Sequence, residues 1–192
     1  MRALAGLGNQ GDAYAGHRHN VGWMLLDVLE RRHAIVDKKD LDLVRLTRIR
    51  LLGRGKNVEP AELWLMRSKT YMNESGLGVA KGCKELDLKP EQILVAFDDI
   101  DLPLSKLRLR ESGGSSGQKG MKSIIRALGT HKIPRLRLGI SGEKASTDTV
   151  AYVLSSFEKN EKDTAAEMVE EAADAVEMVL RSGLIAAMNR FN

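Results

Sequence analysis

The sequence has few of the features that mark secreted or membrane proteins. Its 192 residues include one cysteine, Cys83, so no internal disulfide can form and a reducing compartment is expected. We interpret Cys83 as a small buried apolar residue. No apolar run approaches the roughly 20 residues of a transmembrane helix, and the N-terminus lacks a secretory signal. We therefore expect a cytoplasmic protein without membrane contact, or one from an organelle matrix or stroma if a targeting segment is absent from this chain.

Two common kinds of reactive site are also missing. No Cys/His cluster has zinc spacing, and no serine lies in a G-x-S-x-G motif, so neither a zinc site nor a hydrolase-type acyl-enzyme is indicated. A G-x-G-x-x-G match at residues 6–11 has no predicted helix directly after it, which disfavours dinucleotide binding. Three acids, Asp98, Asp99 and Asp101, leave a divalent-metal site open as a minor alternative. We expect no metal and no cofactor.

The composition is typical of one globular domain, but the charges are unevenly distributed. With 43% hydrophobic and 29% charged residues, residues 1–192 are expected to form a single domain. Between residues 106 and 137 one acid, Glu111, stands against nine basic residues: Lys106, Arg108, Arg110, Lys119, Lys122, Arg126, Lys132, Arg135 and Arg137. From residue 158 onward acids predominate. This asymmetry indicates either a cationic face for nucleic acid or a pair of solvated faces.

Apolar periodicity predicts strands that alternate with helices. Strands are expected within residues 3–9 and over 41–52, 61–66, 93–97, 106–110 and 135–140, with a change of phase near Arg48 and a hairpin turn at 53–57. Helices are expected over 20–32, from the polar loop 68–76 to about 86, over 121–128 and over about 160–181. The interleaving predicts a three-layer α/β domain.

Polar side chains at the ends of these elements predict a site that activates water. Asn20 is expected to cap the helix over 20–32, which places His19 at its N-terminus, where the dipole favours the neutral imidazole. Asp98 follows a buried strand, and open α/β sheets bind ligands at the carboxyl ends of their strands. A carboxylate that orients a histidine makes it a competent base, although a purely structural hydrogen bond is the other reading of His19.

Five short segments stand out along nearly the whole chain. They are Gly6-Leu7-Gly8-Asn9, Arg18-His19-Asn20-Val21-Gly22, Thr70-Tyr71-Met72-Asn73-Glu74-Ser75-Gly76, Asp98-Asp99-Ile100-Asp101-Leu102-Pro103 and Pro134-Arg135-Leu136-Arg137-Leu138-Gly139-Ile140. In order and spacing they resemble the signatures of bacterial-type peptidyl-tRNA hydrolases. The resemblance implies a monomeric α/β enzyme with a twisted mixed sheet flanked by helices, which cleaves the ester between peptide and tRNA without a metal.

The resemblance also implies roles for individual residues. His19 would be the general base, Asp98 would orient it, and Asn9 would position substrate and water. Arg110 and Arg137 match the family's clamp for the tRNA 5′ phosphate and fall within the basic stretch. The implied partner is peptidyl-tRNA, and the ribosome or another structured RNA is a further candidate. The implied substrate-binding residues are Tyr14, Met72, Asn73, Gln118 and Lys119.

The sequence departs from the family pattern at two places. Gly117-Gln118-Lys119-Gly120 stands where the family usually has Gly-His-Asn-Gly, and Lys119 cannot accept a hydrogen bond as asparagine does. Gln10 replaces a usual proline beside Asn9, which loosens that turn. Two classes of function therefore remain: an esterase that acts on peptidyl-tRNA, and a weakened or non-catalytic relative that binds RNA or the ribosome. A metal-dependent phosphohydrolase is the weakest third.

Overall fold

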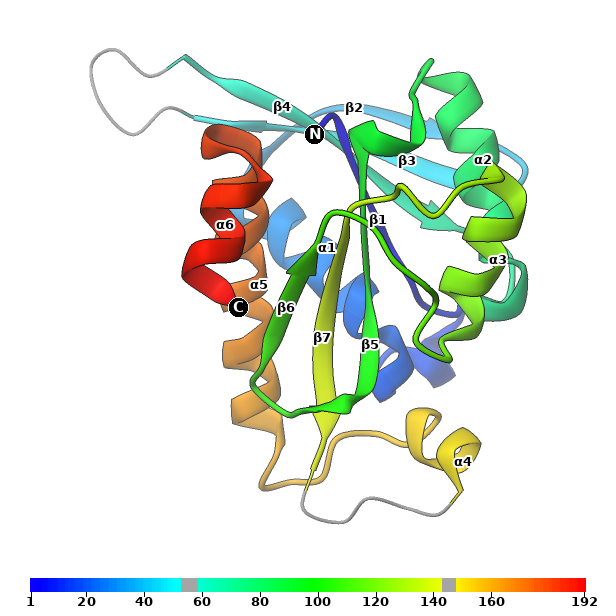
Figure 1. The fold of residues 1–192 in the computed structure, drawn as a ribbon, viewed down its shortest axis with the longest axis vertical. Helices are drawn as coiled ribbons and strands as arrows, with labels where there is room; N and C mark the ends of the chain where they lie inside the picture. Colours follow the sequence, from blue (N-terminus) through cyan, green and yellow to red (C-terminus); the bar gives the residue numbers. More distant parts are fainter. Residues whose placement is uncertain (53–58, 143–147) are drawn as a thin grey trace.

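A computed structural model describes residues 1–52, 59–142 and 148–192, which build one seven-stranded sheet flanked by helices (Figure 1). The strand order is β2-β3-β4-β1-β5-β7-β6, with parallel pairs from β4 to β7 and antiparallel pairs at both edges. The strands are β1 (Ala3–Gly6), β2 (Ala34–Asp40), β3 (Val44–Leu51), β4 (Ala61–Ser68), β5 (Ile93–Pro103), β6 (Leu107–Arg110) and β7 (Arg135–Ser141). The helices are α1 (Val21–Arg32), α2 (Ser75–Glu85), α3 (Lys119–Leu128), α4 (Thr149–Val153), α5 (Lys162–Ser182) and α6 (Leu184–Phe191).

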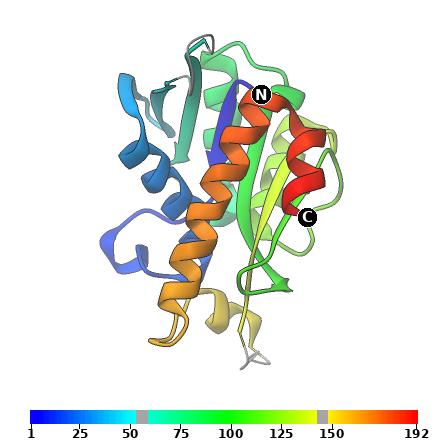
Figure 2. The ribbon, with the colours of Figure 1, turned by 90° about the vertical axis from the view of Figure 1, so that its left-hand side faces the viewer.

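Helices cover both faces of the sheet and make three layers. One core cluster joins the sheet to α1, α5 and α6 and includes Leu25, Val176 and Ala187. The other joins the sheet to α2 and α3 and includes Val79 and Ile124. Figure 2 shows α5 running along the first face with α6 beside it, and Figure 1 shows α2 and α3 together at the other side. The predicted three-layer α/β fold is therefore correct.

The apolar run at the start of the chain forms the central strand. All four residues of β1 are buried between β4 and β5. Helix α1 packs so closely against the end of β1 that a Cβ atom on Gly6 would lie 2.3 Å from the carbonyl oxygen of Gly22. A Cβ atom on Gly22 would likewise lie 2.6 Å from the backbone of Leu7. Close packing of strand and helix thus accounts for these glycines without a nucleotide.

The predicted change of phase near Arg48 has a simple cause. Strand β3 pairs regularly with β4 along its whole length. Val44 and Leu46 face the cluster beneath α2 and α3, whereas Ile49 and Leu51 face the cluster beneath α1 and α5. Because successive strand side chains alternate between faces, the two halves of β3 bury opposite faces.

Several predicted boundaries are wrong, and three elements were not predicted. Strand β2 is an edge strand without a single buried residue, so it lacks apolar alternation. Helix α4 has five residues, and α6 follows α5 after Gly183 alone, so neither gives a separate periodic signal. Strand β5 runs past Asp98 to Pro103, with a register shift against β7 after Asp99. The predicted turn at 53–57 lies outside the described residues.

The single cysteine is buried, and the helices of the described residues are too short or too polar to span a membrane. Cys83 lies in α2 and is 5% exposed, as expected for a small buried apolar residue. Burial raises the pKa of its thiol to about 11, so the thiol stays protonated and unreactive at neutral pH. Within the described ranges, no helix combines the length and the apolar character that crossing a membrane requires.

Candidate active site

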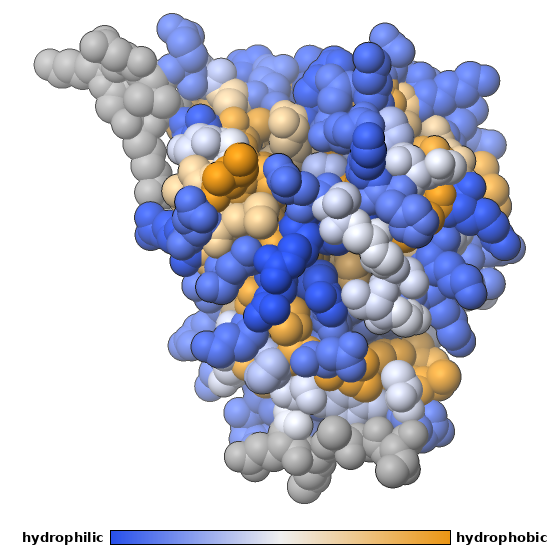
Figure 3. Space-filling model, in the orientation of Figure 1, coloured by the Kyte–Doolittle hydropathy of each residue, from blue (hydrophilic) through white to orange (hydrophobic). Residues whose placement is uncertain are grey.

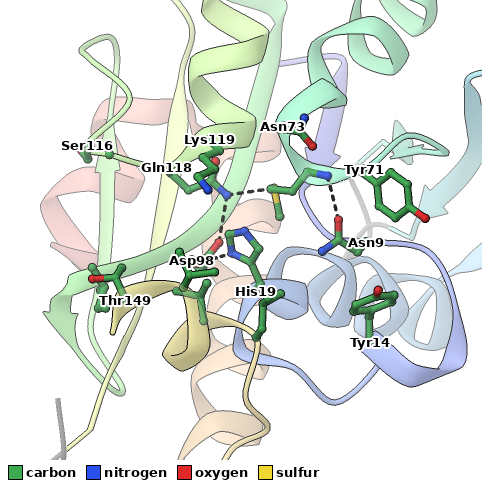
Figure 4. A pocket seen from close by; sticks show the side chains of 16 residues that line it. Asn9, Tyr14, His19, Tyr71, Asn73, Asp98, Ser116, Gln118, Lys119 and Thr149 are labelled. Atoms are coloured by element: carbon green, nitrogen blue, oxygen red, sulfur yellow. Dashed lines mark hydrogen bonds and ion pairs between the residues drawn. The ribbon is translucent and has the colours of Figure 1, made fainter. Parts of the chain in front are cut away.

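Eight of the predicted site residues line one pocket near the carboxyl ends of β1 and β5 (Figure 4). The pocket has a volume of about 470 Å³. Strands β1 and β5 are adjacent and parallel, with Gly6 beside Ala96, so the residues that follow these two lie at the same edge of the sheet. The eight residues are Asn9, Tyr14, His19, Met72, Asn73, Asp98, Gln118 and Lys119.

His19 and Asp98 form the central pair of the pocket. His19 lies in the 3₁₀ turn Arg18–Asn20 directly before α1, and its Nδ1 atom is 2.7 Å from Oδ2 of Asp98. His19 is 9% exposed and Asp98 is 4% exposed. Because a carboxylate can only accept, Nδ1 carries the hydrogen and Nε2 keeps a lone pair. Nε2 is therefore the ring atom that can take a proton from water.

Asn9 is held by hydrogen bonds that leave its amide donor free. The side-chain Oδ1 atom of Asn20 accepts from the Asn9 backbone N–H, and Nδ2 of Asn20 donates to the Asn9 carbonyl, both at 2.9 Å. Oδ1 of Asn9 accepts from the backbone N–H of Met72 at 2.8 Å (Figure 4). This contact fixes which way the Asn9 amide points. Its Nδ2 has no partner among the described residues, so Asn9 offers an oriented N–H donor.

Asn20 does not use its side chain as the sequence predicted. It occupies the N-cap position of α1, but its side chain makes no capping hydrogen bond. Both polar atoms of that side chain are committed to the backbone of Asn9 instead. Asn20 therefore fixes the loop after β1, while the 3₁₀ turn before α1 carries His19.

Gln118 approaches the pair from the start of α3. Its Nε2 atom lies 3.1 Å from Oδ1 of Asp98 and 3.1 Å from the sulfur of Met72. Its Oε1 atom accepts from the backbone N–H of Met121 at 2.7 Å, which caps α3. A Cβ atom on Gly120 would lie 2.5 Å from the Met72 sulfur, so a larger residue there would require the Met72 side chain to move.

The outer wall of the pocket is more exposed and partly apolar. Asn73 and Lys119 are exposed, and Tyr14 is half-buried, with its ring edge-on to His17 at 5.4 Å between centroids. Sequence reasoning missed the apolar part of this wall. It comprises Tyr71, Ile100, Val150, Val153 and Leu154. Val150 and Val153 belong to α4, which is too short to show periodicity, and Leu154 directly follows it.

Arg110 and Arg137 lie outside the pocket, on strands β6 and β7. Arg110 pairs in register with Arg135, and Arg108 pairs with Arg137, so these four side chains share one face of the sheet. Figure 3 shows hydrophilic side chains gathered over these strands. Arg137 forms an ion pair with Asp99, and Arg135 is buried against backbone carbonyl groups. We call Arg108, Arg110, Arg135 and Arg137 the arginine face.

The acids of residues 98–101 do not converge on one point. Asp98 faces His19 and Gln118, Asp99 pairs with Arg137, and Asp101 is exposed. Neighbouring strand residues point to opposite faces, so Asp98 and Asp99 serve different surroundings. In the described part of the chain, no three His, Cys, Asp or Glu side chains are grouped so that they could hold a metal ion.

Comparison with known proteins identifies the family. A family model described as peptidyl-tRNA hydrolase matches residues 3–192. The chain belongs to the peptidyl-tRNA hydrolase family. The peptidyl-tRNA hydrolase of Symbiobacterium thermophilum is 38% identical over 193 residues, which cover 100% of this chain and 98% of that protein. The one from Synechococcus sp. (strain JA-3-3Ab) is 42% identical, covering 100% of this chain and 83% of that protein.

A solved structure from the same family agrees with the fold. The crystal structure of peptidyl-tRNA hydrolase from Acinetobacter baumannii has a TM-score of 0.87 and 29% sequence identity, and the match covers 100% of this chain and 94% of that one. In the present chain, four of the five segments noted in the sequence contribute residues to the pocket, and the fifth forms β7. The resemblance read from those segments is confirmed.

The contacts of Asn20 lead to a prediction about stability. Asn20→Ala would leave a buried backbone N–H and carbonyl of Asn9 unpaired, so the free energy of unfolding should fall by about 1–3 kcal/mol. Asn160→Ala is the matched control, because Asn160 is exposed and its side chain makes no hydrogen bond among the described residues. The control should change stability by less than about 0.5 kcal/mol. Equal unfolding curves in urea for the two variants would contradict a stabilising role for the hydrogen bonds of Asn20.

Proposed function

We propose that this chain hydrolyses the ester bond that joins a peptide, or an N-blocked amino acid, to tRNA and so releases tRNA for reuse. The observation that carries the proposal is the buried 2.7 Å contact between His19 and Asp98 in a pocket large enough for the reacting ends of a substrate. The relatives named peptidyl-tRNA hydrolase, which match the chain over its full length, support the choice of substrate.

The chemistry follows from the orientation of three side chains. Nε2 of His19 takes a proton from a water molecule while the water oxygen attacks the ester carbonyl carbon. Asp98 accepts from Nδ1–H and stabilises the imidazolium that forms. The free Nδ2–H of Asn9 donates to a substrate oxygen. The bond from the carbonyl carbon to the ribose oxygen then breaks, and the imidazolium gives the proton to the leaving ribose oxygen, which becomes a hydroxyl.

The outer residues of the pocket fit the two halves of such a substrate. Tyr14 and Asn73 lie on one side of His19 (Figure 4), and Met72 also lines the pocket. These apolar and amide groups suit a peptide backbone and its side chains. Lys119 is exposed at the start of α3, where its charge suits a phosphate or a developing oxyanion. Arg110 and Arg137 on the arginine face are proposed to bind the tRNA 5′ phosphate.

The alternative functions have weaker support. A binding module without catalysis would not need the oriented His19 and Asp98, and the matching relatives carry the name of a hydrolase. A single domain over residues 1–192 is supported by the continuous sheet. A monomeric state and binding to the ribosome remain predictions.

Removal of the base gives the first test of this function. His19→Ala should lower single-turnover hydrolysis of an N-blocked aminoacyl-tRNA by roughly 10²- to 10⁴-fold, because general-base catalysis contributes that much. The native chain should release the amino acid equally fast with and without a chelator.

His33→Ala is the matched control for this test. His33 follows α1 and bonds to Glu177 of α5, remote from the pocket lining, so the variant should keep the native rate. Release that does not depend on His19, or that stops in chelator, would refute the mechanism.

The salt dependence of tRNA binding tests the arginine face. If Arg110 neutralises a phosphate, Arg110→Ala should reduce the slope of log affinity against log salt by about one unit. Arg110 is the better target, because Arg137→Ala would also leave the buried Asp99 carboxylate without its ion pair.

Lys38→Ala is the matched control for charge. Lys38 is exposed on β2, at the opposite edge of the sheet, so its loss should leave the slope unchanged. Equal slopes for the native chain and Arg110→Ala would remove Arg110 from the phosphate site.

A further inference from the structure

Gln118 has almost no hydrogen-bonding capacity left for a substrate. A glutamine amide has two N–H donors and one carbonyl acceptor. Here Nε2 lies 3.1 Å from the Asp98 carboxylate and 3.1 Å from the Met72 sulfur, and Oε1 accepts from the backbone of Met121 at 2.7 Å. The residue is also 7% exposed. Both the NH₂ group and the carbonyl oxygen of the Gln118 side chain therefore face protein groups.

The orientation of this amide is determined by its surroundings. The backbone N–H of Met121 can only donate, so the atom that faces it must be the carbonyl oxygen. The NH₂ group must then face Asp98, where the carboxylate can only accept. A flipped amide would place two donors together at α3 and two acceptors together at Asp98. Gln118 is thus locked as a donor toward Asp98.

We propose that Gln118 is a positioning residue that fixes the Asp98 carboxylate for its contact with His19. The proposal deepens the hydrolase function and rests on it. Oδ2 of Asp98 faces His19 and Oδ1 faces Gln118, so one donor holds each oxygen and the carboxylate cannot rotate away from the imidazole. Gln118 also joins this carboxylate to the first turn of α3 and to the Met72 wall.

The donor from Gln118 also limits how strongly Asp98 attracts a proton to His19. A hydrogen bond to a carboxylate disperses its negative charge, so removing the bond should favour the imidazolium form of His19. The other titratable side chains that line the pocket are Tyr14, Tyr71 and Lys119, and none of these bonds to His19 or Asp98. Arg18 and Asp99, the chain neighbours of the pair, bond to Glu161 and Arg137 instead.

Two substitutions separate positioning from helix capping. Gln118→Asn keeps an amide and a preferred N-cap residue but is one methylene too short to reach Asp98. Gln118→Met keeps the length of the side chain but removes both the cap and the donor. Both should lower kcat about tenfold with KM within about twofold, because a donor to a catalytic charge acts on the chemical step. Only Gln118→Met should also lose roughly 2–4 °C in Tm.

The pH dependence provides a readout that a purely structural role would not change. In both variants the acidic limb of the pH–rate profile should move to higher pH by about half a unit to one unit. Gln92→Met is the matched control. Gln92 accepts from the Lys89 backbone N–H at 2.8 Å and is not part of the pocket, so this substitution should not shift the acidic limb of the pH–rate profile.

Titration of the His19 ring by NMR in the free protein makes the test independent of turnover. An upward shift of the His19 midpoint in Gln118→Asn and Gln118→Met supports the positioning role even if the chain hydrolyses no peptidyl-tRNA. Unchanged midpoints in both variants would overturn it. A higher KM with unchanged kcat and unchanged midpoints would also overturn it and assign Gln118 to substrate binding.

Discussion

The Asp98 carboxylate is the group on which the site depends. A carboxylate that is 4% exposed must find hydrogen-bond donors within the protein, because its burial is otherwise costly. Its donors are His19 and Gln118, which lie 79 and 20 residues away along the chain. The turn before α1 and the start of α3 must therefore both reach β5 before Asp98 is satisfied. The geometry that orients the base is in this way a product of the assembled fold.

Strand β5 links the pocket to the arginine face. Asp98 points to His19, and the next residue, Asp99, points to the opposite face and pairs with Arg137. Because side chains alternate along the strand, the proposed water-activating pair and the proposed phosphate contact depend on neighbouring residues but lie on opposite faces of the sheet. Their charges are therefore not in direct contact. Hydrolysis of an ester at the end of an RNA chain calls for both features: a base beside the reacting carbonyl and positive charge along the phosphates of the RNA.

Much of the fold was predictable because its strands and helices carry their own periodic signals. The apolar runs of β1 and β5 and the apolar residues at helical spacing in α5 are visible in the sequence. Strand β2 has no such signal, because its pairing with β3 depends on a sheet edge that exists only once the sheet has formed. Helices α4 and α6 are too short or too close to α5 to be separated by periodicity.

The site was predictable in its residue types but not in its connections. His19, Asp98 and Asn9 were identified from their positions at the ends of elements and from the family resemblance, and the structure places them in one pocket. The partner of Asn20 was not predictable, because both a helix cap and a bond to Asn9 suit an asparagine and only the packing of β1 against α1 decides between them. Gln118 was identified in the sequence as a substrate-binding residue, but its bond to Asp98 was not predictable, because it depends on where α3 begins relative to β5.

The most direct test of the central claim is the tautomer of His19, measured by ¹⁵N NMR of the ring at a pH where the imidazole is neutral. The Asp98 contact predicts hydrogen on Nδ1 and a bare Nε2 that faces the pocket. Hydrogen on Nε2 would contradict the account, because the lone pair would then face a carboxylate and the ring could not take a proton from water.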